Sequence, residues 1–268
     1  MKKNPITQQL LNRHRLSNIV DRQAAIEQWF EADAGRALLK EQQLLINEHL
    51  ETLFGYHLMQ LSAVPGICLY GNSRASHNFA LSFKVGQEGE YALVCHETQL
   101  PIDTDALDIC IVHHLLDFTP SPHELLKEVQ RVTRPGGHIL VVGFNALGVF
   151  GAMSFLGGLS GHKFWNNRLL SARRLADWMT LLDLSVQKVD YGFYRLPMKK
   201  RWLQRLSSKV EQILRLRQPA LGAGFYIMLT KNEHLTLTPH KPLWAQKRPL
   251  VPLSSGNYSP SKNNKTIH

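Results

Sequence analysis

The chain contains little cysteine and has no long apolar segment. Its three cysteines, Cys68, Cys95 and Cys110, match no zinc motif in their spacing. We therefore expect reduced thiols in or near strands, and no metal site. No apolar run of about 18 residues occurs, so a membrane-spanning helix is not expected, and no apolar signal segment follows Met1. These absences favour a cytoplasmic protein.

Acidic residues are scarce in two segments, which therefore carry most of the net charge of +10. Residues 195–217 contain eight Lys and Arg against one acid, and residues 239–268 contain five against none. The rest of the chain is slightly acidic, so the basic character belongs to appendages and not to the core. Because the core lacks the broad basic surface of nucleic-acid-binding proteins, nucleic acid is a less favoured partner.

The segments at both ends and the basic segment define the expected domains. Apolar residues recur at helical spacing between the cations of residues 198–217, which predicts a basic amphipathic helix. This helix either lies on an anionic membrane surface or packs over a substrate pocket. Residues 239–268 are rich in Pro, Lys, Ser and Asn and predict a disordered tail. Residues 1–32 are polar without a strong period, and predict an N-terminal extension of a domain over residues 33–238.

Apolar runs and helical periods alternate within that domain and indicate an α/β fold. Helical spacing predicts helices over residues 33–54, from Ser121 and from Ser171. Ser121, Pro122 and Glu124 together predict a capping box. Because the strands are apolar runs, not alternating patterns, we expect a mostly parallel sheet buried on both faces. The expected strands are residues 58–64, 78–85, 91–95, 108–112, 138–143, 184–191 and 224–231.

Two of these strands end in residues that are candidates for chemistry. In a β-α-β unit the ligand-binding loops lie at the carboxyl ends of the strands, here His113-His114 and Gly143-Phe144-Asn145. A histidine in such a place could take a proton from an acceptor oxygen or nitrogen, because its pKa lies near neutrality. His113 is therefore the candidate catalytic residue. The alternative is a polar strand end without chemistry.

Four short motifs follow one another in the middle of the chain: Leu100-Pro101-Ile102, Asp108-Ile109, Glu128-Val-Gln-Arg131-Val132 and Pro135-Gly136-Gly137. Together they resemble the class I S-adenosylmethionine-dependent methyltransferases, in particular the methyltransferase type 11 group. Residues 143–145, with residues 171–178 downstream, are most similar to the bacterial YafS-type proteins. The resemblance covers roughly residues 30–245. It implies a Rossmann-like sheet of seven strands with helices on both faces and an antiparallel last strand, and S-adenosylmethionine as cofactor.

The resemblance also implies where the cofactor binds, and there the residues depart from the family pattern. The glycine-rich loop after the first strand is Leu61–Gly66 here, with one glycine, so that Ser62 and Ala63 would face the cofactor. None of Ser82, Phe83 and Lys84 supplies the acid expected after the second strand. The acid after the third strand falls at His96, with Glu97 beside it as an acceptor for the adenine amino group. The implied cofactor contacts are Ser62, Ala63, His96, Glu97, Leu100 and His113.

Two functions are compatible with this pattern. The first is transfer of a methyl group from S-adenosylmethionine to a small or lipid-like acceptor. The second is a methyltransferase-like protein without activity, which serves as a binding or scaffold protein through its basic helix. The altered glycine loop favours the second function, whereas the intact motifs of residues 100–145 favour the first.

Overall fold

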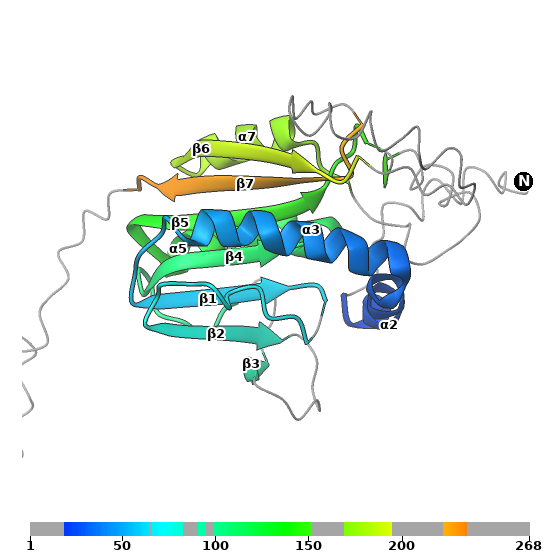
Figure 1. The fold of residues 1–268 in the computed structure, drawn as a ribbon. Coiled ribbons are helices and arrows are strands. Elements are labelled where there is room, and N and C mark those ends of the chain that lie inside the picture. Colours follow the sequence, from blue (N-terminus) through cyan, green and yellow to red (C-terminus); the bar gives the residue numbers. More distant parts are fainter. Residues whose placement is uncertain are drawn as a thin grey trace, which may run out of the picture. The chain divides into compact units, whose positions relative to one another are not determined.

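A seven-stranded sheet organises the chain, in the order β3-β2-β1-β4-β5-β7-β6 (Figure 1). Neighbouring strands from β3 to β5 are parallel, and β7 is antiparallel to both β5 and β6. The predicted fold class, a mostly parallel Rossmann-like sheet whose last strand is antiparallel, is therefore confirmed. The strands are β1 (His57–Ser62), β2 (His77–Ser82), β3 (Tyr91–Val94), β4 (Leu107–His113), β5 (Thr133–Phe144), β6 (Leu184–Gly192) and β7 (Phe225–Asn232).

The structure is a computed structural model, and it describes part of the chain. The described residues are 19–64, 66–82, 91–94, 99–148, 150–151, 169–194 and 222–234. They belong to one unit that ends at Leu235, and residues 236–268 form a second unit. The predicted basic helix, the predicted tail and the candidate contacts His96 and Glu97 lie outside the described residues.

Helices cover both faces of the sheet. Figure 1 shows α3 crossing one face, with α5 and α7 on the other. The buried stripe of α3 repeats every four residues through Leu38, Gln42 and Ile46, so one polar side chain lies in an apolar row. The helices are α2 (Ile19–Glu31), α3 (Asp33–Leu50), α4 (Leu115–Phe118), α5 (Pro122–Val132) and α7 (Ala172–Leu181).

The central place of β4 in the sheet explains why its sequence is an apolar run. All seven of its residues are buried, because strands lie on both sides and helices cover both faces.

Cys110 within β4 is a free buried thiol, and its burial raises its pKa, whereas Cys68 is a free exposed thiol. The described residues include no group of three metal-binding side chains. Among these residues, no helix combines the length and the apolar character needed to cross a membrane.

The predicted domain boundary after residue 32 is wrong. Ile26 and Phe30 of α2 are buried in the same core as the strands. Their four-residue spacing places them on one face of α2, but the polar residues elsewhere in residues 1–32 hide this face in the composition. The N-terminal helix α2 is therefore part of the domain.

The predicted start of α5 is also corrected in one respect. Ser121 precedes the helix and Pro122 is its first residue, as expected, but the Ser121 side chain makes no capping hydrogen bond. Its carbonyl oxygen accepts from Leu125 N instead. Ser171 does cap α7, because its hydroxyl accepts from Arg174 N at 3.3 Å.

Candidate functional site

The site lies where the order of the strands reverses. From β1 the chain adds β2 and β3 on one side, and then returns to place β4 on the other side of β1. In open α/β sheets the loops diverge at such a switch point, and the crevice at the carboxyl ends binds ligands. The strand register pairs Ser62 with His113, so these two predicted residues meet there.

His113 ends β4 and is fully buried. Its Nδ1 lies 2.9 Å from Ser62 Oγ, and its Nε2 lies 3.0 Å from Oε1 of Gln42. Burial lowers the pKa of His113 well below its ordinary value, and the neighbouring His114 lowers it further. Both ring nitrogens are thus occupied on a neutral ring, which differs from the accessible general base that we expected.

His114 follows directly and adopts a left-handed backbone conformation, with φ of 52°. It is fully buried, and burial lowers its pKa to about 3. Its Nε2 lies 2.8 Å from Nε2 of Gln42, and its Nδ1 lies 2.9 Å from Oδ2 of Asp117. The ring also packs on Phe144 and Phe30, with centroids 4.0 and 5.5 Å away. His114 therefore has a structural role in the site, with polar partners at both ring nitrogens and aromatic rings packed against it.

Asp117 of α4 closes this set of polar groups and was not predicted. Its Oδ2 also accepts from Phe144 N at 3.0 Å. Within the described part of the chain, its Oδ1 and the hydroxyl of Tyr226 have no hydrogen-bond partner, although both are buried. Burial raises the pKa of Asp117 well above its ordinary value, which favours the neutral carboxyl. Burial and the nearby Asp117 also raise the pKa of Tyr226.

Gln42 of α3 links the two histidines and was also missed. Its oxygen faces His113 and its nitrogen faces His114, and the side chain is fully buried. The available signal was its position, because it stands between Leu38 and Ile46 at the spacing of buried residues. A polar residue in such a stripe needs buried partners.

The loop after β1 is closed by a serine in place of the expected glycines. Ser62 is half-buried, and its Oγ accepts from Val64 N at 3.0 Å. The buried Ala63 donates its N–H to the carbonyl oxygen of His113 at 3.0 Å. Gly66 has a φ of +73° and is exposed, so one glycine still makes the turn. The Ser62 hydroxyl therefore contacts both His113 and the loop backbone, while the backbone of Ala63 ties the loop to the end of β4.

Leu100, another predicted contact, is anchored to α5. Its N–H donates to Glu128 Oε2 at 3.0 Å, and its carbonyl oxygen accepts from Arg131 Nη2 at 3.2 Å. Arg131 also pairs with Glu128 and donates to the carbonyl oxygen of Ile102 at 3.0 Å. The hydrogen bond from Arg131 is the main reason that the pKa of Glu128 is lowered. The Glu-x-x-Arg motif of the resemblance thus fixes the Leu-Pro-Ile segment.

Aromatic rings gather near the carboxyl ends of β4 and β5. Trp29 of α2 packs edge-on against Phe144 and Phe150, with centroids 5.8 and 5.5 Å away. Phe144 and Phe150 lie 5.2 Å apart, and Phe193 follows at 5.9 Å from Phe150. We call Trp29, Phe30, Phe144, Phe150 and Phe193 the aromatic cluster. The aromatic cluster makes the surroundings of the carboxyl ends of β4 and β5 apolar.

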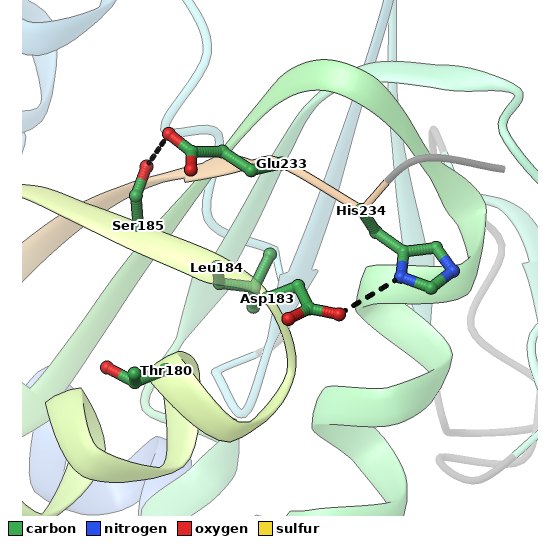
Figure 2. A pocket seen from close by; sticks show the side chains of 6 residues that line it. All are labelled: Thr180, Asp183, Leu184, Ser185, Glu233 and His234. Carbon is green, nitrogen blue, oxygen red and sulfur yellow. Dashed lines mark hydrogen bonds and ion pairs between the residues drawn. The ribbon is translucent and has the colours of Figure 1, made fainter.

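A separate hollow lies at the opposite end of the sheet from the carboxyl ends of β1 and β4. Its lining comes from the start of β6 and the end of β7, which pair near the amino end of β5 (Figure 2). Figure 2 shows Asp183 paired with His234, and Ser185 bonded to Glu233. Asp183 and His234 are largely exposed. This hollow is thus distant in the fold from Ser62 and His113 and does not belong to their site.

Comparison with known proteins gives matches in sequence and in fold. Residues 68–141 match the family model for a methyltransferase domain. Over 214 residues the chain is 25% identical to the uncharacterized protein YafS of Escherichia coli K12. This match covers 80% of this chain and 84% of that protein. An uncharacterized methyltransferase of Mycobacteroides abscessus is 29% identical over 102 residues, 38% of this chain and 36% of its own length.

Among solved structures, the crystal structure of an S-adenosylmethionine-dependent methyltransferase from Archaeoglobus fulgidus has a similar fold. The TM-score is 0.55 at 10% identity, over 77% of this chain and 98% of that one. This likeness bears on the fold alone. Together with the sequence matches it confirms the predicted resemblance to the methyltransferase type 11 group.

Proposed function

Because this chain is related in sequence and fold to S-adenosylmethionine-dependent methyltransferases, we propose that it transfers a methyl group from S-adenosylmethionine to a small or lipid-like acceptor. The observation that carries the proposal is the pairing of Ser62 with His113 at the switch point of the sheet. This is the place where such sheets bind their ligands.

The residues at the switch point fit a cationic cofactor. S-adenosylmethionine supplies a methyl group on a positively charged sulfur when it is bound. Ser62 and the turn that ends at Gly66 would hold its amino-acid part, and His96 and Glu97 remain the predicted contacts of its adenine. His113 and His114 are held neutral by burial, so they do not repel a positive charge. The absence of the usual glycines changes how the loop is closed, but it leaves the Ser62 hydroxyl at the crevice.

The described residues favour catalysis by positioning. Since both ring nitrogens of His113 are occupied, we assign it the task of orienting Ser62, in place of the general base expected from the sequence. The aromatic cluster excludes water from the carboxyl edge and supports an apolar acceptor. A methyl transfer gains most of its rate from holding the two reactants in line, so few charged groups are needed.

Calorimetric titration with S-adenosylmethionine and S-adenosylhomocysteine tests this proposal. We expect both to bind, and Ser62→Ala to weaken binding about tenfold, the equivalent of one hydrogen bond to a charged group. His234→Ala, at the opposite edge of the sheet, is the matched control and should bind like the wild type. The absence of both heat and thermal shift at millimolar ligand would contradict the proposal.

The alternative function, a scaffold without activity, is not favoured by the comparisons, since the matching family model is that of a methyltransferase domain. The same titration decides between the two functions. A membrane-surface role for residues 198–217, the lesser role for nucleic acid and a cytoplasmic location all remain predictions from the sequence.

A further inference from the structure

Polar side chains from four elements, β1, β4, α3 and α4, form one continuous row of hydrogen bonds. It runs from Ser62 at the end of β1, through His113, Gln42 of α3 and His114, to Asp117 of α4. The four donor-to-acceptor distances lie between 2.8 and 3.0 Å. Apart from the half-buried Ser62, each of these side chains is fully buried.

The direction of the row can be worked out from the amide of Gln42. Its nitrogen is a donor that faces Nε2 of His114, so this ring nitrogen is an acceptor. The neutral His114 must then carry its single ring proton on Nδ1. Asp117 Oδ2 accepts from this Nδ1–H as well as from Phe144 N.

The second half of the row follows from the amide of Gln42. Its oxygen is an acceptor, so His113 must carry its proton on Nε2 and leave Nδ1 bare. The hydroxyl hydrogen of Ser62 is therefore committed to His113 Nδ1. Val64 N–H donates to the same Ser62 oxygen, which leaves that oxygen one lone pair and no hydrogen for a ligand.

We propose that Gln42 is a positioning residue that sets the direction of this row, so that Ser62 faces the crevice as a hydrogen-bond acceptor only. This inference rests on the proposed function and specifies it: Ser62 would receive an N–H of the cofactor's ammonium group and not contact its carboxylate. An amide is the side chain needed between two neutral histidines, because it offers an acceptor to one and a donor to the other. A carboxylate offers acceptors only, and a thioether has no donor.

The first test needs no ligand and no variant. In the full chain with 15N-labelled histidine, ring chemical shifts distinguish protonated from bare nitrogens. We expect His113 to carry its proton on Nε2 and His114 on Nδ1. Protons on Nδ1 of His113 and Nε2 of His114 would mean that the row runs the other way, and would overturn the proposal.

Two substitutions then test Gln42 itself. Gln42→Met keeps the length of the side chain without its polar atoms, and should release the tautomers and weaken binding of S-adenosylhomocysteine about tenfold. Gln42→Glu should leave His113 unchanged but place a proton on Nε2 of His114, because each oxygen of the carboxylate needs a donor. Gln43→Met, an adjacent exposed position on α3, is the control and should change neither readout.

The two proposals fail in different ways. If the wild-type tautomers are as expected and Gln42→Met alters them, yet no S-adenosyl compound binds, the proposed function falls while the role of Gln42 stands. If Gln42→Met folds, as circular dichroism can establish, and keeps both tautomers and affinity, then Gln42 does not set the direction of the row.

Discussion

The carboxyl group of Asp117 lies where an ionised side chain would find little to balance its charge. Burial raises its own pKa well above the ordinary range and lowers that of His114 to about 3, so both partners are favoured in their neutral forms. Oδ2 accepts two hydrogen bonds, and Oδ1 is left to carry the proton. Such a carboxyl has nearly the same donors and acceptors as an amide.

Asp117→Asn should therefore be at least as stable as the wild type at pH 7. In the unfolded chain Asp117 ionises above about pH 3.9, whereas the folded protein keeps its proton. The unfolded state then binds fewer protons, so wild-type stability falls by about 1.4 kcal/mol per pH unit from this group as the pH rises toward the folded pKa. The variant lacks this loss, and its advantage should grow with pH.

Urea unfolding between pH 4 and 8 measures that difference, with Asp177→Asn, an exposed position on α7, as the control. A variant that is about 3–5 kcal/mol less stable would show that Asp117 is half of a charged pair with His114.

Some of these residues could be predicted from the sequence and others could not. The place of Ser62 and His113 at strand ends could be predicted, because apolar runs reveal the strands that they end. Gln42 and Asp117 were not, since their roles depend on α3 and α4 packing against β4, which no local pattern encodes. The burial of His113 could not be predicted for the same reason, because it involves Gln42, a residue 71 positions away in the sequence.

At the scale of elements, three strands were predicted more accurately than the other elements, whereas β5 begins at Thr133, five residues before its expected start. The bounds of β4, β6 and β7 agree with expectation to within one residue, because buried strands are continuous apolar runs. The helix predicted over residues 33–54 ends at Leu50, and the capping box at Ser121 does not form. Helix ends depend on side-chain orientation, which composition does not determine.

The helix α2 gives the test at this scale. Phe30→Ala should lower the free energy of unfolding by about 3–5 kcal/mol, because the ring is 3% exposed and packs near the rings of His113 and His114. Leu44→Ala on α3 is the control, since Leu44 is 58% exposed and should change stability little. Denaturant unfolding compares the two, and equal effects would contradict the place of α2 in the core.

For the whole molecule, the positive net charge does not come from the residues that the structure describes. The described residues contain 11 Lys and Arg against 17 Asp and Glu, although the complete chain has a net charge of +10. The excess of cations therefore belongs to the remaining segments. Any attraction of this protein to an anionic surface should come from those segments and should weaken with added salt.

The place of β7 between β5 and β6 matters while the chain is being made. Among the described strands, β6 pairs with β7 alone, and one edge of β5 is covered by β7. A ribosome that has not yet reached residue 232 therefore carries a nascent chain in which β6 and one edge of β5 lack their partner strand. Such edges are prone to pair with other chains.

A chain that stops at Gly222 should therefore accumulate in the pellet and show no cooperative unfolding. A chain that stops at residue 238 keeps β7 and should remain in the supernatant. Sedimentation after synthesis in a cell-free system compares the two, and equal solubility would contradict this view. If it holds, the sheet closes only after residue 232 has been made, and the protein depends until then on whatever shields nascent chains.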